Sequence, residues 1–224
     1  MKYYRLKDKL NRDEVVKEED GSVFKQYRYF FGEERWVHSL ILYDYLCPEN
    51  EEYEEYEEIT EAEAFALLDE QRERYNKLLE LAVKVATEAH KGQADKGGNP
   101  YIGHPKAVAA AVKNTEFKIV AYLHDVCEDT PITLDDLADM GFTYRIVNSV
   151  RLLTKTDELT YEQYLDRLRY DPAARAVKLA DMRHNSDLSR IPCPTEKDYA
   201  RVEKYKRAIA FLESVEPTQD DLRL

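Results

Sequence analysis

Residues 120–130, V-A-Y-L-H-D-V-C-E-D-T, place four metal-binding or proton-accepting side chains directly behind an apolar run. On a helix, residues three and four apart lie on one face, so His124 is expected beside Glu128, and Asp125 beside Glu128 and Asp129. Acidic side chains beside an apolar run cost free energy unless a cation or hydrogen bonds compensate. The stretch therefore predicts a helix that carries part of a divalent-metal site.

Two further segments complete a coordination set. Residues 89–105, A-H-K-G-Q-A-D-K-G-G-N-P-Y-I-G-H-P, end in a histidine before a proline, and residues 176–185, A-V-K-L-A-D-M-R-H-N, supply an aspartate after an apolar run. The predicted ligands are His104, His124, Asp125 and Asp181. Two imidazoles and two carboxylates suit a first-row divalent ion such as manganese, iron or zinc better than calcium. His184 is ambiguous and is left outside this set.

The order H…HD…D, with the strings around it, resembles the HD-domain metal-dependent phosphohydrolases. Between residues 75 and 187 the strings are A-H-x-G-Q, K, P-Y-I-x-H-P, L-H-D-x-x-E-D-T, L-T-K and V-K-L-A-D with a following H-N. They are similar to the hydrolase half of the RelA/SpoT-type alarmone enzymes and their small stand-alone relatives. The resemblance implies hydrolysis of the 3′-pyrophosphate of guanosine tetra- or pentaphosphate to GDP or GTP and pyrophosphate. It also implies a divalent metal cofactor, with Mn²⁺ favoured over Fe²⁺ or Zn²⁺.

Roles follow for the acids and cations near the predicted ligands. Glu128 is the candidate to accept the proton of the attacking water, with Asp129 as its partner. The expected substrate contacts are Lys96, Asp95, Lys178, Asn185 and Lys155. Asp181 could instead simply cap its helix or pair with Lys178, and Asn185 could orient Asp181 or be a plain helix-surface residue.

Two positions depart from the resemblance. The alarmone hydrolases usually carry a basic residue directly before the lysine of the first motif, where this chain has Asp95. Their arginine after A-D is also absent, because Met182 occupies that position and Arg183 follows it. Two alternatives stay open: a phosphohydrolase of another phosphorylated nucleotide or small molecule, and a non-catalytic nucleotide-sensing module.

Composition restricts the partners. The 224 residues carry a net charge of −12, which argues against nucleic acid as the main partner but permits a small nucleotide. The three cysteines form no C-x-x-C pair, which fits a reducing compartment, and Cys127 is interpreted as a small buried residue. The N-terminus lacks an apolar signal segment and no run reaches membrane-spanning length. We expect a cytoplasmic protein without a membrane partner; its oligomeric state stays open.

The expected architecture is mainly α: a helical HD-domain fold preceded by a small antiparallel β-rich region. The expected divisions are 1–72 (β-rich, ending in a helix), 73–216 (helical hydrolase domain) and 217–224 (tail). Strands are expected within residues 2–6, 23–31 and 35–43, with a turn at Gly32-Glu33-Glu34 and a solvated acidic loop at 49–58.

Helix starts are indicated by capping residues and by proline. Thr60 and Glu63 form a capping box for a helix from Glu61 to about Asp69, and a second helix is expected over residues 78–89. Later helices are expected from Lys118, Thr133, Tyr144, Thr160, Pro172 and Thr195.

Overall fold

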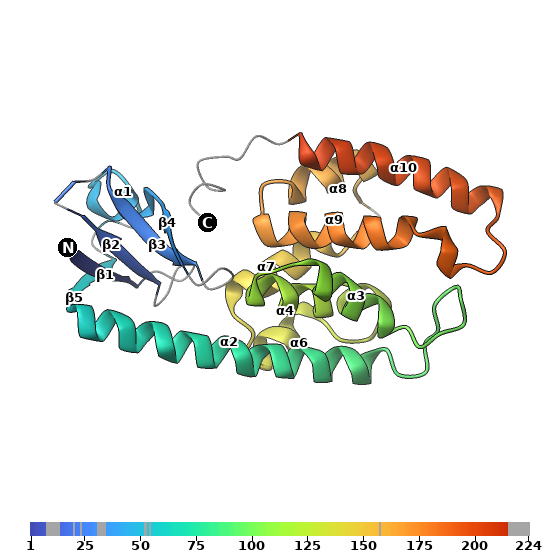
Figure 1. Cartoon of the computed structure of the whole chain (residues 1–224), viewed down its shortest axis with the longest axis horizontal. Coiled ribbons are helices and arrows are strands. Elements are labelled where there is room, and N and C mark those ends of the chain that lie inside the picture. Colours follow the sequence, from blue (N-terminus) through green and yellow to red (C-terminus); the bar gives the residue numbers. More distant parts are fainter. Residues whose placement is uncertain are drawn as a thin grey trace. The chain divides into compact units, whose positions relative to one another are not determined.

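The structure, a computed structural model, describes residues 1–7, 14–19, 21–22, 24–30, 35–51, 53, 55–156 and 158–214 (Figure 1). The chain forms two compact units, the first comprising Met1–Lys77 and the second beginning at Leu78. The first unit is built on an antiparallel sheet and the second is helical, so the predicted fold class is confirmed. The expected tail at 217–224 and the expected turn at Gly32-Glu33-Glu34 lie outside the described residues.

The sheet of the first unit has two covered faces. Its strands are β1 (Lys2–Leu6), β2 (Val15–Glu18), β3 (Gln26–Phe30), β4 (Arg35–His38) and β5 (Tyr56–Ile59), in the order β4-β3-β2-β1-β5. All neighbouring strands are antiparallel. Side chains alternate along a strand, so the two faces of the sheet pack against different helices. Tyr4 and Val16 pack with Leu42 of α1 (Ile41–Leu46). On the other face, Tyr3 and Val15 pack with the first turns of α2 (Glu61–Ala89).

Two sequence expectations in the first unit were wrong. Residues 35–43 do not stay extended, because α1 begins at Ile41 and its apolar residues pack against one face of the sheet. Residues 56–58, expected in a solvated loop, belong to β5, which pairs with β1. The pairing brings the ring of Tyr56 within 5.8 Å of Tyr4, so a partner strand far away in sequence outweighed the local acidity.

One long helix, α2 (Glu61–Ala89), replaces the two expected ones. Its 29 residues include no glycine or proline, so nothing in the backbone interrupts the helix. The predicted capping box is confirmed: Thr60 Oγ1 accepts from the Glu63 backbone at 3.2 Å, and Glu63 Oε2 accepts from the Thr60 backbone at 2.8 Å. The helix begins in the first unit and ends in the second.

The rest of the second unit is a helical assembly. Its helices are α3 (Gly103–Ala111), α4 (Thr115–Leu123), α5 (Val126–Asp129), α6 (Leu134–Asp139), α7 (Tyr144–Leu153), α8 (Tyr161–Leu168), α9 (Pro172–Ser186), the 3₁₀ turn η1 (Leu188–Arg190) and α10 (Glu196–Glu213). The predicted starts of α6 to α10 are confirmed to within a residue. In contrast, α4 begins three residues before the expected Lys118, because the Asn114 side chain accepts from the backbone of Glu116 at 2.7 Å and caps the helix there.

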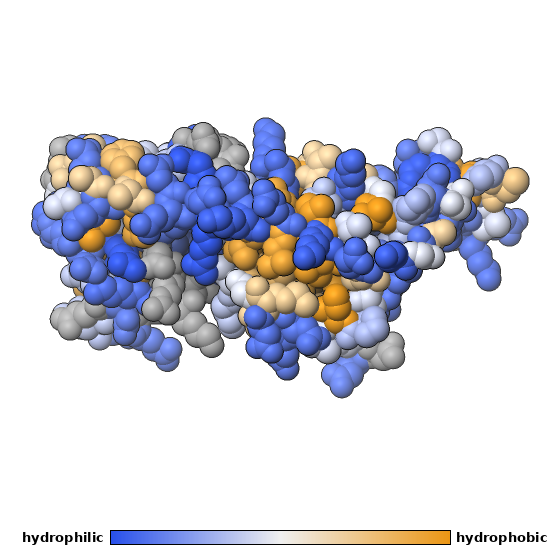
Figure 2. Space-filling model, turned by 90° about the horizontal axis from the view of Figure 1, so that it is seen from below, coloured by the Kyte–Doolittle hydropathy of each residue, from blue (hydrophilic) through white to orange (hydrophobic). Residues whose placement is uncertain are grey.

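The centre of this unit is α9, which packs against α3, α4, α7 and α10. Small buried residues such as Ala173, Ala174 and Ala180 on α9 leave room for its neighbours. None of the described helices combines the length and hydropathy needed to span a lipid bilayer. Figure 2 shows hydrophilic side chains over most of the visible face and hydrophobic ones gathered in a smaller area.

Candidate metal centre and adjoining cavity

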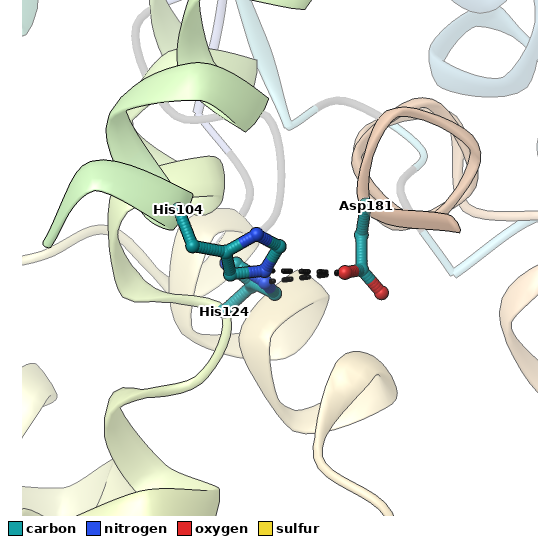
Figure 3. Close-up of side chains that lie close together, drawn as sticks. All are labelled: His104, His124 and Asp181. Atoms are coloured by element: carbon teal, nitrogen blue, oxygen red, sulfur yellow. Dashed lines mark ion pairs between the residues drawn. The ribbon is translucent and has the colours of Figure 1, made fainter. Parts of the chain in front are cut away.

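Three helices bring two histidines and an aspartate together. His104 lies in the first turn of α3, His124 at the end of α4, and Asp181 on α9. Their potential ligand atoms all lie within 4.8 Å of one another. All three side chains are buried, and Figure 3 shows the histidine rings turned toward the Asp181 carboxylate. Buried groups of this type need a cation or hydrogen bonds for compensation.

The fourth predicted ligand, Asp125, flanks this cluster. His104 Nε2 lies 3.2 Å from Asp181 Oδ1, and His124 Nε2 lies 4.0 Å from the same oxygen. Asp125 Oδ2 lies 3.1 Å from His124 Nε2 and 3.5 Å from His104 Nε2. The structure therefore places all four predicted ligands around one point.

Residues 124 and 125 both reach this point because the predicted single helix is interrupted there. α4 ends at Leu123, and α5 begins at Val126 with Asp125 as its N-cap. On one regular helix, consecutive side chains point about 100° apart. The break between the two helices is the correction to the sequence expectation, and it lets His124 and Asp125 face the same atoms.

The proton arrangement of His124 leaves one ring nitrogen available. Its Nδ1 lies 2.7 Å from the carbonyl oxygen of Ala121, which can only accept, so Nδ1 carries a hydrogen. Nε2 is buried and has no hydrogen-bond partner among the described residues. Histidines that bind metals through one nitrogen usually donate from the other to a backbone carbonyl or a carboxylate. The donor set fits a divalent cation, which would take the place of a proton on Nε2 facing the Asp125 carboxylate.

Charge in the cluster also favours a cation. Burial lowers the pKa of His124, but Asp125 and Asp181 outweigh burial and raise it to about 9. Burial acts to raise the pKa of Asp181, yet Lys178 and the two histidines hold it well below its ordinary value. The Asp125 carboxyl likewise has a lowered pKa, because His124 outweighs the effect of its burial. Two ionised carboxylates therefore face the imidazole nitrogens.

Two of the expected substrate contacts bond Asp181 in this structure. Lys178 Nζ lies 2.8 Å from Asp181 Oδ2, and Asn185 Nδ2 donates to Asp181 Oδ1 at 2.6 Å. The Lys178–Asp181 ion pair was the simpler alternative for Asp181, and the structure contains it next to the imidazoles. Asn185 also lines the cavity described below.

The two expected catalytic acids lie at the exposed edge of the cluster. The Tyr101 hydroxyl donates to Asp125 Oδ2 at 2.6 Å and lies 3.4 Å from Asp129 Oδ2, so it links Asp129 to the proposed ligand Asp125. Burial and the nearby Asp125 raise the pKa of Asp129. Glu128 Oε2 accepts from the backbone nitrogen of Lys155 at 3.1 Å. Lys155 therefore contacts this edge through its backbone.

A cavity of about 230 Å³ adjoins the cluster. Its lining includes Lys96, Tyr101, His104, Asn185, Arg190 and Arg201. Asp95 also lines it: Oδ1 accepts from the backbones of Gly97 and Asn99, both at 2.9 Å, and Oδ2 lies 3.2 Å from Arg190. Lys96 Nζ lies 2.7 Å from Asp198 Oδ1. Both expected first-motif contacts are thus at the cavity, each paired with an opposite charge.

Sequence reasoning left His184 outside the ligand set and did not single out Arg190, and the structure places both beside His104. His184 Nδ1 lies 2.7 Å from His104 Nδ1, and Arg190 Nη1 lies 2.6 Å from His184 Nδ1. The helical spacing of three residues from Asp181 could have indicated His184. Arg190 follows the end of α9, where no periodicity connects it to the site. Met182, in place of the expected arginine, is completely buried.

Comparisons with known proteins bear on the same region. No protein-family model matches the chain. The chain is 36% identical over 124 residues to the bifunctional (p)ppGpp synthase/hydrolase SpoT of Escherichia coli K12, covering 49% of this chain and 18% of that protein. It is 34% identical over 116 residues to a guanosine-3′,5′-bis(diphosphate) 3′-pyrophosphohydrolase of Haemophilus influenzae, covering 45% and 17%. It is 30% identical over 148 residues to a probable GTP pyrophosphokinase of Mycobacterium leprae, covering 60% and 19%.

The chain thus spans less than a fifth of the length of these curated relatives. Among solved structures it is similar to a metazoan orthologue of SpoT that hydrolyses ppGpp and plays a role in starvation responses. That likeness has a TM-score of 0.50 at 21% identity and covers 66% of this chain and 91% of that one. The resemblance seen in the motifs is confirmed at the level of sequence and fold.

Proposed function

We propose that the helical unit is a metal-dependent phosphohydrolase that removes the 3′-pyrophosphate of guanosine tetra- or pentaphosphate. The products are GDP or GTP and pyrophosphate. One observation carries the proposal: the Nε2 atoms of two buried histidines face the carboxylates of Asp125 and Asp181. The names of the curated relatives, which include 3′-pyrophosphohydrolases, support this substrate.

His104, His124, Asp125 and Asp181 are the proposed ligands of the metal, with Mn²⁺ as the proposed ion and Fe²⁺ or Zn²⁺ as alternatives. When bound, such an ion supplies Lewis acidity, which favours ionisation of water near neutral pH and polarises a phosphoryl oxygen. His124 would give up its second proton on binding the ion, so that both buried imidazoles supply nitrogen ligands, and the two carboxylates would offset the charge of the ion. Incomplete coordination by the protein leaves room for water and substrate.

Glu128 and Asp129 are the proposed acid–base pair. Water attacks the phosphorus bonded to the 3′ oxygen, the bond from that phosphorus to the 3′ oxygen breaks, and the 3′ oxygen takes up a proton. Glu128 accepts the proton of the attacking water, and Asp129 supports it from the same short helix. The bond from Glu128 to the Lys155 backbone holds its carboxylate at the edge of the cluster.

The adjoining cavity is the proposed substrate site. Lys96, Asn185 and Asp95 line it and are its proposed contacts. Lys178, which pairs with Asp181, and Lys155, whose backbone binds Glu128, are proposed contacts outside this lining. Cations offset phosphate charge most strongly where water is excluded. Asp95 does not leave the cavity acidic, because Arg190 pairs with it at 3.2 Å.

The proposal is tested by incubating the pure protein with guanosine tetraphosphate and Mn²⁺ and separating the products by anion-exchange chromatography. We expect equal amounts of GDP and pyrophosphate, and no turnover after removal of the metal with a chelator. Unchanged substrate at high protein concentration rejects the proposal. Tight nucleotide binding without turnover, insensitive to Glu128→Gln, selects a sensing module.

A second candidate is a phosphohydrolase of another phosphorylated nucleotide. Two observations favour it: the carboxylate of Asp95 lines the cavity, and position 182 holds a buried methionine. Release of orthophosphate from other nucleotides in a substrate panel, with guanosine tetraphosphate left intact, selects this candidate.

A further inference from the structure

Four side chains form a continuous row from the cavity to the metal centre. Asp95 Oδ2 lies 3.2 Å from Arg190 Nη2, and Arg190 Nη1 lies 2.6 Å from His184 Nδ1. His184 Nδ1 lies 2.7 Å from His104 Nδ1. His104 Nε2 then faces Asp181 Oδ1 at 3.2 Å. The row links an arginine outside the cluster to a proposed metal ligand.

The chemistry of the guanidinium decides the direction of each hydrogen bond in this row. An arginine has five N–H donors and no acceptor, so Arg190 must donate to His184 Nδ1. His184 Nδ1 is therefore an unprotonated acceptor. Since it cannot donate, the hydrogen in its contact with His104 comes from His104 Nδ1, and the single lone pair of His184 Nδ1 is shared by the two donors.

The consequence for His104 is that Nδ1 donates and Nε2 faces the carboxylates. This is the arrangement of His124, whose Nδ1 donates to the Ala121 carbonyl. Metal-binding histidines are oriented in this way by the partner of their second nitrogen. Both imidazoles therefore present Nε2 to the same point, one because of a backbone carbonyl and the other because of Arg190 and His184.

Arg190 is itself held firmly. Its Nη1 also donates to the backbone carbonyl of His184 at 3.0 Å, and Asp95 binds its other terminal nitrogen. A Cβ at Gly97 would lie 2.6 Å from the backbone oxygen of Arg190, so only glycine permits this approach of the loop. The loop and η1 together fix the guanidinium beside His184.

We propose that Arg190 is a positioning residue for the metal centre: its hydrogen bond fixes the His184 ring with Nδ1 as an acceptor, and His184 thereby holds His104 with Nε2 directed at the metal. Asp95 anchors Arg190 in this role. The inference rests on the proposed metal centre, but it concerns residues outside the ligand set.

The test measures zinc affinity of the full chain by competition with a chromophoric chelator, without substrate. Arg190→Met keeps the aliphatic chain and removes every donor, and we expect zinc binding weakened by about 10- to 100-fold. His184→Phe keeps a ring and removes the acceptor, and we expect a similar loss. The double variant should lose no more than either single one, because both changes break the same row.

Arg201→Met is the matched control. Arg201 lines the same cavity and carries the same charge, but its guanidinium pairs with Asp198 at 3.2 Å. We expect its zinc affinity to match that of the original chain. An equal loss in Arg201→Met would show a general charge effect and overturn the inference, as would unchanged zinc binding in Arg190→Met.

A second readout needs no metal. The chain has five histidines, so ¹⁵N-histidine labelling gives few NMR signals, each assignable by substitution. We expect a protonated Nδ1 in His104 and an unprotonated Nδ1 in His184, with mixed forms of His184 in Arg190→Met. A protonated His184 Nδ1 in the original chain overturns the inference. An original chain that binds no divalent ion rejects the metal centre itself, whereas normal binding in Arg190→Met rejects only the role of Arg190.

Discussion

At the residue scale, the pairing of Lys178 with Asp181 combines a structural role with a proposed ligand role. Both side chains are largely shielded from solvent, and their charged atoms lie 2.8 Å apart. Removing one partner of a buried ion pair leaves an uncompensated charge, whereas replacing both partners by apolar residues can be neutral. The two roles of Asp181 can therefore be separated by a second substitution at Lys178.

We predict that Asp181→Ala loses both metal and stability, with a decrease of about 3–5 kcal/mol in the free energy of unfolding. Lys178→Met added to Asp181→Ala should recover most of the stability and none of the metal binding. Urea denaturation and metal analysis of the purified variants measure the two effects. Full metal content in the double variant would remove Asp181 from the ligand set.

Glu128→Gln should retain metal and lose rate, because the amide preserves the shape of the side chain but cannot accept a proton. General-base catalysis is worth about 10²–10⁴-fold, so kcat should fall by that factor. Glu203→Gln, the same change at an exposed residue of α10, is the control and should behave as the original chain does. Loss of metal in Glu128→Gln, or a normal kcat, would contradict the assigned role.

At the scale of elements, α9 depends on its N-cap. Asp171 accepts from the Ala174 backbone at 2.8 Å and from the Ser149 hydroxyl at 3.0 Å, and it begins the helix that carries Asp181, His184 and Asn185. Loss of an N-cap side chain costs about 1 kcal/mol. The orientation of one proposed ligand therefore depends on a cap ten residues earlier in the chain.

The cap also predicts a pH dependence. Burial raises the pKa of Asp171 in the folded chain. The Asp171 carboxyl therefore contributes to the stability of the fold at low pH, and this contribution is lost as pH rises through the raised pKa. Asparagine can accept the same hydrogen bonds without the charge. Asp171→Asn should therefore gain stability relative to the original chain as pH rises from about 4 towards neutrality. Urea denaturation at several pH values measures the gain.

Asp136 on α6 is the matched control, because its pKa is shifted in the opposite direction. It caps its helix through Thr133, and this hydrogen bonding lowers its pKa, so its stabilising contribution is lost as pH falls. Asp136→Asn should therefore lose stability relative to the original chain as pH rises from acid to neutral. If rising pH changed the relative stability of Asp171→Asn and Asp136→Asn in the same direction, the assignment to the two caps would be contradicted.

At the scale of the whole molecule, the proposed metal binds only the helical unit. A ligand that binds the folded state at about 100 times its Kd stabilises it by about 2.7 kcal/mol. Manganese should therefore slow hydrogen exchange of the backbone amides in α3, α4 and α9, as measured by mass spectrometry. Amides of the sheet in the first unit should exchange as before, and equal slowing there would contradict a site confined to the helical unit.

Local signals predicted many of the helices. Thr60, Thr133, Thr160 and Thr195 lie at helix starts, because a short polar side chain there satisfies backbone donors that have no partner in the helix. The sheet was predicted less well. β5 forms because it pairs with β1, which is distant in sequence. The acidic residues of β5 gave a stronger local signal for a loop.

The sequence by itself determined the helical class and predicted the four proposed ligands, because residue type and the order of the motif strings can be read without knowing the packing. Only the tertiary structure decided how those ligands are oriented. The orientation depends on the break between α4 and α5. It also depends on two contacts between segments that no periodicity relates: Asp95 with Arg190, and Arg190 with His184. Their physical cause is packing around α9, which brings the loop before α3 and the turn after α9 to one place.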